Sequence, residues 1–171
     1  DGIYVEQTAS FLSKKIYMPQ LIYADYDLHP SWYRKASRTN IYTNIRNKIK
    51  NLKKVQSKKR REQLDRLNNL LLLLENRGVF RFSILRFGYL EKLIKENRPI
   101  IVTVDPYHTF KKNRGKGARI TSFSHGVLLV GYEKNKIILH DPGGFVGSYA
   151  KIDKDIFLQG WYKDWGAAIY V

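Results

Sequence analysis

Cysteine is absent from this chain of 171 residues, and no other absence excludes as much chemistry. A chain without thiols forms no disulfide bonds, builds no thiolate-rich metal site and supplies no cysteine nucleophile of its own. The absence does not fix the compartment, because secreted proteins can also lack cysteine.

Long apolar runs are absent as well. The longest run of leucines, residues 70–74, is far too short to cross a bilayer, because a spanning helix needs about 20 apolar residues. No signal peptide is visible, and the chain begins with Asp1 rather than methionine, as a processed or truncated product would. These features slightly favour the cytoplasm and leave the compartment open.

Acidic residues are scarce. The chain has 15 Asp and Glu against 31 Lys and Arg, which gives a formal net charge of +16. Such a balance favours an acidic partner, namely nucleic acid, an anionic lipid surface or an acidic protein. A solvated surface in a thermophile or in a generally basic proteome explains the charge equally well.

The composition nevertheless predicts a folded chain. With 43% hydrophobic and 13% aromatic residues, it has enough apolar surface to form a core. Its length suits one domain. We interpret residues 1–171 as a single domain, with a helical part up to about residue 77 and a sheet-rich part from about residue 78.

The helical part contains the most basic segment. Residues 1–17 predict a short amphipathic helix, and a narrow apolar stripe over about 41–76 predicts one long helix or two broken ones. Within this stretch, Arg46–Arg61 contains no acidic and no aromatic residue. Clustered cations on a helix could follow a phosphate backbone or lie on an anionic membrane, but single-strand binding also needs aromatic side chains for stacking. The plain alternative is a solvated helix face inserted into the fold.

The sheet-rich part alternates between apolar runs and polar breaks. The elements expected are an edge strand at 79–83, a helix at 89–97, a buried strand at 100–104, a helix from Lys154 capped by Asp153, and a last strand at 165–171. Residues 105–123 are polar and basic, and they predict a loop that borders the following strand.

The most informative stretch predicts a β-hairpin over residues 124–141, because two apolar strands flank a short polar turn. His125 stands at the start of the first strand and Asp141 at the far end of the second. Antiparallel pairing brings these two positions side by side. An imidazole beside a carboxylate is the base-and-orienter half of a nucleophilic hydrolase. The alternative is that Asp141 merely satisfies a polar strand-end histidine.

The hairpin carries a resemblance to a known family. The motif His125-Gly126-Val127-Leu128-Leu129-Val130-Gly131-Tyr132, followed by a strand that ends in Asp141-Pro142, resembles the C39-type cysteine peptidases, a papain-like group. The likeness continues through Gly143-Gly144, Ile152-Asp153 and Phe157-Leu158 to Trp161. It covers the chain from about residue 84 to the end.

The resemblance implies an α+β, papain-like fold in which an antiparallel sheet packs with helices and the basic helices form a long insertion. It implies that His125 is the general base, that Asp141 is its orienting carboxylate, and that the substrate is a peptide or protein. No cofactor is implied. A metal site formed by His108, His125 and His140 is disfavoured, because His140 and Asp141 are strand neighbours that point to opposite faces.

The missing cysteine is the main departure from the family pattern, which requires a cysteine on an N-terminal helix and a glutamine six residues earlier. Gln7 and Ser13 have that separation, but Ser13 is followed by Lys14-Lys15 rather than by a glycine-led segment. We therefore interpret Ser13 as an ordinary helix serine. The helix at 1–17 is expected to correspond to the second helix of the family domain, with the cysteine helix before Asp1.

Three functional hypotheses follow from the sequence. The chain is a C39-like peptidase whose cysteine segment lies outside these residues, or a pseudo-peptidase that binds peptide without cutting it. The third hypothesis is a basic adaptor that binds nucleic acid or an acidic surface through residues 46–61.

Overall fold

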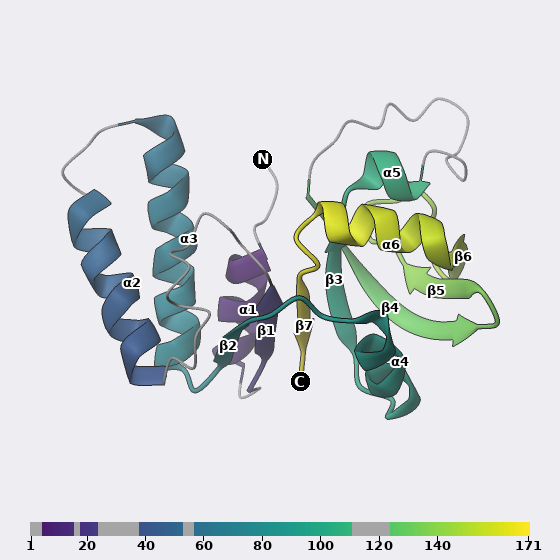
Figure 1. The fold of residues 1–171 in the computed structure, drawn as a ribbon, viewed down its shortest axis with the longest axis horizontal. Coiled ribbons are helices and arrows are strands. Elements are labelled where there is room, and N and C mark those ends of the chain that lie inside the picture. The colour runs from purple at the N-terminus through teal and green to yellow at the C-terminus, as the bar shows by residue number, and fades with distance from the viewer. Residues whose placement is uncertain (1–4, 16–17, 24–37, 53–56, 111–123) are drawn as a thin grey trace.

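The computed structural model describes residues 5–15, 18–23, 38–52, 57–110 and 124–171 (Figure 1). The described helices are α1 (Val5–Ser13), α2 (Arg38–Leu52), α3 (Lys58–Glu75), α4 (Phe87–Lys95), α5 (Pro106–Phe110) and α6 (Lys154–Lys163). The strands are β1 (Gln20–Tyr23), β2 (Val79–Phe82), β3 (Ile100–Val104), β4 (His125–Glu133), β5 (Lys136–His140), β6 (Ala150–Asp153) and β7 (Ala168–Tyr170). The α+β class predicted from the sequence is confirmed.

The strands of the described residues join one seven-stranded sheet in the order β2-β1-β7-β3-β4-β5-β6. The pairs are antiparallel as expected, except that β1 and β2 run parallel. Parallel neighbours need a crossover connection, and the segment that contains α2 and α3 supplies it. The helical part of the chain therefore also contributes a strand, β1, which pairs with the C-terminal strand β7.

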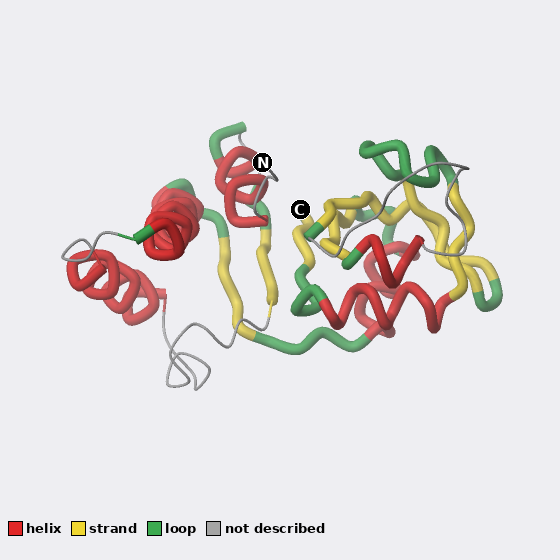
Figure 2. The backbone as a smooth tube through the Cα atoms, turned by 90° about the horizontal axis from the view of Figure 1, so that it is seen from above, coloured by secondary structure: helices red, strands yellow, loops and turns green. Residues whose placement is uncertain are grey.

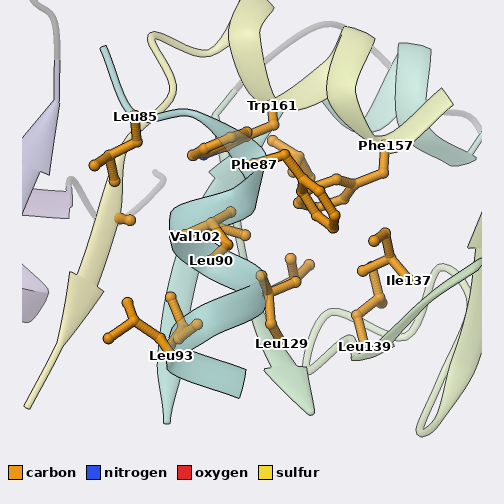
Figure 3. Close-up of a cluster of buried hydrophobic side chains, with 14 of the residues drawn as sticks. Leu85, Phe87, Leu90, Leu93, Val102, Leu129, Ile137, Leu139, Phe157 and Trp161 are labelled. Atoms are coloured by element: carbon orange, nitrogen blue, oxygen red, sulfur yellow. The ribbon is translucent and has the colours of Figure 1, made fainter. Parts of the chain in front are cut away.

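Alternate residues of the central strands enter two hydrophobic cores. On β7, Ala168 and Tyr170 belong to the first core, whereas Ile169 belongs to the second. The first core packs α4, α5 and α6 against one face of the sheet (Figure 3). The second core packs α1, α2 and α3 against the opposite face. This separation follows from the period of two in a strand, which sends successive side chains to opposite faces.

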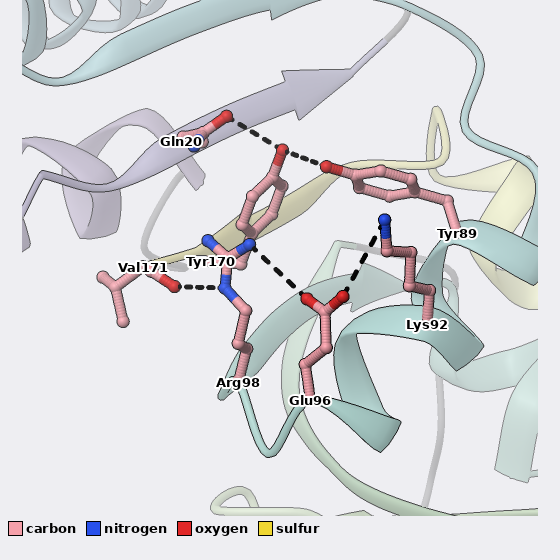
Figure 4. A network of polar contacts seen from close by, with 7 residues as sticks. All are labelled: Gln20, Tyr89, Lys92, Glu96, Arg98, Tyr170 and Val171. Atoms are coloured by element: carbon pink, nitrogen blue, oxygen red, sulfur yellow. Dashed lines mark hydrogen bonds and ion pairs between the residues drawn. The ribbon is translucent and has the colours of Figure 1, made fainter.

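A polar network connects the two halves of the sheet where β7 meets β1 (Figure 4). The Tyr170 hydroxyl lies 2.8 Å from the Tyr89 hydroxyl of α4 and donates to Gln20 Oε1 of β1 at 3.0 Å. Arg98 donates from Nε to the carbonyl of Val171, and its guanidinium lies over the Tyr170 ring. Burial, followed by the bond with Tyr89, raises the pKa of Tyr170 well above its usual value.

The basic stretch forms two helices rather than one. Ser57 caps α3, because its hydroxyl accepts from the Arg60 N–H at 3.3 Å. At the other end of α3 the residue with positive φ is Arg77, at 66°, and not the glycine that follows it. Gly78 is required for a different reason: a side chain there would overlap Leu73.

Two elements were not expected. Residues 106–110, predicted as part of a loop, form the short helix α5, which begins where Asp105 accepts from the Tyr107 N–H. Strand β6 pairs with β5 at the far edge of the sheet. The last strand is shorter than predicted, and Trp165, at the start of the predicted range, lies outside β7 and is exposed. The rest of the 105–123 prediction lies outside the described residues.

The predicted cap of α6 is confirmed, and the inner face of this helix belongs to the first core. Asp153 accepts from the Asp155 N–H at 3.1 Å, and Phe157 and Trp161 are fully buried. Within the described part of the chain, none of the helices is both long enough and apolar enough to cross a membrane.

Candidate functional site

The β4–β5 hairpin positions His125 and Asp141. Val104 of β3 pairs with His125, and Leu128 pairs with His140. His125 shares its face of β4 with buried Val127, and Asp141, directly after β5, shares its face with buried Leu139. Both side chains therefore point to the face covered by α5 and α6, because a period of two separates each from a residue of the first core.

The two side chains are in direct contact. His125 Nε2 lies 2.6 Å from Asp141 Oδ1. The His125 side chain is 12% exposed, whereas the Asp141 side chain is fully buried. This juxtaposition is the one predicted from the sequence, and the pairing of β4 with β5 produces it.

A turn of backbone amides holds the Asp141 carboxylate. Gly143 N–H donates to Oδ1 at 2.8 Å, and Val146 N–H donates to Oδ2 at 3.0 Å. Burial alone raises the pKa of Asp141, but the hydrogen bonds from His125, Val146 and Gly143 outweigh it, so the net pKa is below its usual value. The carboxylate is therefore ionised at neutral pH, and it only accepts hydrogen bonds. It follows that His125 Nε2 carries the proton of their shared bond.

Aromatic rings flank the imidazole. The Phe145 ring centroid lies 5.0 Å from that of His125 and the Phe110 centroid 6.0 Å, both nearly perpendicular to it. Gly143 completes the enclosure, because a side chain there would overlap the His125 ring. The imidazole orientation is thus set by packing as well as by the hydrogen bond.

A second polar group adjoins the start of β4. Ser124 donates to Asp164 Oδ2 at 2.7 Å. The pKa of Asp164 is raised above its usual value, mainly by burial. Hydrogen bonds from Thr103 and Ser124 lower this pKa, whereas the nearby negative charge of Asp105 raises it further. None of these polar residues was predicted from the sequence as part of a site. The position of Asp105, directly after the buried strand 100–104, could have indicated it, but no local pattern distinguishes Asp164.

The first turn of α1 lies toward this polar group. Arg66 of α3 donates from Nε to Glu6 Oε1 at 2.9 Å. The positive charge of the same arginine also lowers the pKa of Asp164. Glu6 is buried, so this ion pair attaches α1 to α3 beneath the surface.

Ser13 lies at the other end of α1, where its hydroxyl donates to the Ser10 carbonyl at 2.7 Å. Its neighbour Leu12 lines an apolar cavity of about 240 Å³ together with Pro99 and Val171. Pro99 precedes β3, whereas His125 pairs with the last residue of β3, so this cavity and Ser13 are at the opposite end of the sheet from His125.

The other histidines do not join His125. His108 is in α5, with Nδ1 3.3 Å from Asp105 Oδ1, and His140 has the opposite strand parity to Asp141. Among the described residues there is no group of three or more His, Asp or Glu side chains that could hold a metal ion. His29 lies outside the described residues.

Comparison with solved structures finds a candidate C39-like peptidase from Bacillus anthracis. It is 22% identical to this chain, with a TM-score of 0.38, and the match covers 50% of this chain and 46% of that chain. The chain therefore matches less than half of that protein's length. No curated protein matches the chain.

A family model, described as the Peptidase_C39 like family, matches residues 34–169. The matched range begins before α2, so it extends further toward the N-terminus than the resemblance seen in the sequence and includes the two basic helices. Because this range covers most of the 171 residues and includes both His125 and Asp141, the chain belongs to the Peptidase_C39 like family.

Proposed function

We propose that these residues form the base-bearing part of a C39-type cysteine peptidase site, with His125 as the general base and Asp141 as its orienting carboxylate. The contact of 2.6 Å between the buried carboxylate and the imidazole is the observation that supports this role most directly. Family membership also supports the proposal, because hydrolysis of a peptide bond is the reaction that the name of the family implies.

The chemistry follows from which ring nitrogen Asp141 engages. With Nε2–H donated to the carboxylate, proton transfer to and from a reactant falls to Nδ1. A thiol placed there would lose its proton to Nδ1, and the ionised Asp141 would stabilise the resulting imidazolium. The thiolate would attack the peptide carbonyl, and the imidazolium would return the proton to the departing amine.

The thiol itself is not among these 171 residues. We therefore expect residues 1–171 alone to bind peptide at this site without cleaving it. A cysteine supplied from outside them would complete a peptidase, and its absence from the native protein would leave a pseudo-peptidase.

The deciding measurement is the intact mass and N-terminal sequence of the protein isolated from its native source. A mass near 20.1 kDa beginning at Asp1 would exclude a cysteine and overturn the peptidase role. A heavier species with a cysteine upstream would support it.

In that heavier species, hydrolysis of a peptide library should be abolished by thiol alkylation and by His125→Ala. His140→Ala is the matched control, because this histidine lies on the same hairpin with the opposite strand parity. Equal loss of activity in both variants would contradict the role assigned to His125.

A further inference from the structure

One surface of the molecule is strongly basic and has no part in the site above. It is formed by the second half of α2 and the first turn of α3, and we call it the basic tip. Its described cations are Arg46, Lys48, Lys50, Lys58, Lys59, Arg60 and Arg61. The sequence adds Lys53 and Lys54 to the same run, but they lie outside the described residues.

The two helices bring these cations together in space. The Tyr42 hydroxyl near the start of α2 donates to Glu75 Oε1 at the end of α3 at 2.8 Å, so the helices run antiparallel. The end of α2 and the start of α3 are therefore at one end of the pair, which forms an outer edge of the molecule beyond β2 (Figures 1 and 2). Lys50, Lys58 and Lys59 are exposed there.

Acidic residues are absent from the segment of sequence that carries the basic tip. The segment 46–61 contains no acidic residue, and the first turn of α3 likewise has none. Lysine and arginine in that turn also face the positive end of the helix dipole, where negative charge is favoured. Mutual repulsion of these cations opposes folding, and an anionic partner would relieve it.

We propose that the basic tip binds the phosphate backbone of a nucleic-acid duplex without reading its sequence. This proposal does not depend on the function proposed for His125 and Asp141. A duplex carries roughly one negative charge per 1.7 Å of its axis, whereas an extended acidic peptide offers at most one per residue, or about one per 3.3 Å. The seven described cations of the tip can therefore meet more anionic groups over the same length on a duplex than on such a peptide.

The other anionic partners fit less well. None of the exposed large hydrophobic side chains among the described residues is in α2 or α3, and the apolar stripe of α2, including Ile45, is buried against α3. The described residues of the tip therefore offer no exposed large hydrophobic side chain for insertion into a lipid surface. The segment 46–61 also contains no aromatic residue on which the bases of a single strand could stack.

The test is fluorescence anisotropy with a labelled mixed-sequence DNA duplex of about 20 base pairs, in about 50 to 200 mM salt. We expect the affinity to fall steeply with salt. The tip variant K50Q/K58Q/K59Q/R61Q should bind at least tenfold more weakly at the lower salt. Its plot of log K against log salt should be shallower by about 3 to 4, because each lost phosphate contact removes about 0.9 from the slope.

The matched control is K14Q/K95Q/K134Q/K163Q, which also removes four exposed cations but takes them from outside the tip. It should keep its affinity within about twofold and its slope within about 1. The charge-preserving variant K50R/K58R/K59R should bind as the wild type does, which separates loss of charge from loss of folding.

Three results would overturn the proposal. The first is an equal loss of affinity in the tip and control variants, and the second is no detectable binding at the lowest salt. The third is tighter binding to single-stranded DNA, to polyglutamate or to phosphatidylserine vesicles than to the duplex at the same salt, which would assign the tip to that partner instead.

Discussion

At the scale of single residues, the geometry of the candidate site depends on one position without a side chain. A Cβ atom at Gly143 would overlap the His125 ring and approach Asp141 Oδ1 to 3.2 Å. We expect Gly143→Ala to displace the imidazole and break its bond to Asp141. Loss of the downfield Nε2–H proton signal in NMR spectra would show this.

Gly126→Ala is the control for Gly143→Ala. Gly126 is the chain neighbour of His125, yet a Cβ atom there would meet nothing within 4 Å. Its spectrum should keep the His125 signal. An unchanged signal in both variants would mean that packing at Gly143 does not position the ring.

The hydrogen-bonded carboxylate of Asp141 also contributes to the stability of the fold. In Asp141→Asn an amide NH₂ group must face a backbone N–H donor, either of Gly143 or of Val146, so we expect a loss of about 1 to 3 kcal/mol at pH 7. The folded pKa is lowered, so the stabilisation by the carboxylate is complete above the unfolded pKa of about 3.9. It is lost as pH falls through the folded value, and the difference between variant and wild type should narrow below about pH 4.

Urea unfolding between pH 7 and pH 3 measures this difference. Asp65→Asn, a change at an exposed carboxylate of α3, serves as the control and should alter the free energy of unfolding by less than about 0.5 kcal/mol. A difference in free energy of unfolding between wild type and Asp141→Asn that stays constant with pH would contradict the assignment of the ionised form.

In the wild type, nitrogen NMR should place the proton of the neutral His125 ring on Nε2.

At the scale of elements, α5 and the residue before it pack closely against α6 at Gly160. The Asp105 N–H donates to the Gly160 carbonyl at 3.0 Å, and a Cβ atom at Gly160 would overlap the Thr109 hydroxyl. Phe110, which flanks His125, is on the same short helix. The position of α5 therefore affects the wall of the site.

We expect Gly160→Ala to destabilise the fold by about 1 to 3 kcal/mol, because overpacking outweighs the better helix propensity of alanine. Thermal unfolding measures the loss. Gln159→Ala, an exposed change on the same helix, should be neutral or slightly stabilising. An increase in stability for Gly160→Ala would show that α5 can shift away at little cost.

At the scale of the whole molecule, one sheet lies between two cores. Adjacent residues of β7 and of β3 enter opposite cores, so neither core can be lost without disturbing strands that serve the other. We predict a single cooperative unfolding transition, as expected of one domain. Far-UV circular dichroism mainly reports the helices. Fluorescence reports the α6 side when it is measured in a Trp32→Phe background, in which Trp161 and Trp165 are the remaining tryptophans.

The matched variants are Leu70→Ala in the second core and Leu139→Ala in the first. Each should cost about 2 to 5 kcal/mol and shift both probes by the same amount. If Leu70→Ala moved only the circular dichroism signal, the helical part would unfold by itself, and the one-domain interpretation would be wrong.

Much of the architecture followed from local patterns in the sequence. The hairpin was predictable because apolar strands flank a two-residue turn, Lys134-Asn135, and strand alternation then fixes which side chains share a face. The cap of α6 was predictable because Asp153 needs only its own chain neighbours. Helix α5 was missed because its five residues are too few for a periodic pattern, and its start depends on buried Asp105.

The sequence by itself determined which family this chain resembles, that its 171 residues include no thiol, and that its net charge is positive. These properties depend on residue identity and order alone. Only the tertiary structure decided that Thr103 and Ser124 meet Asp164 near the start of β4, and that α1 is attached to α3 through Glu6 and Arg66. Such contacts join residues far apart in the chain. They arise from packing across the sheet, which no local pattern encodes.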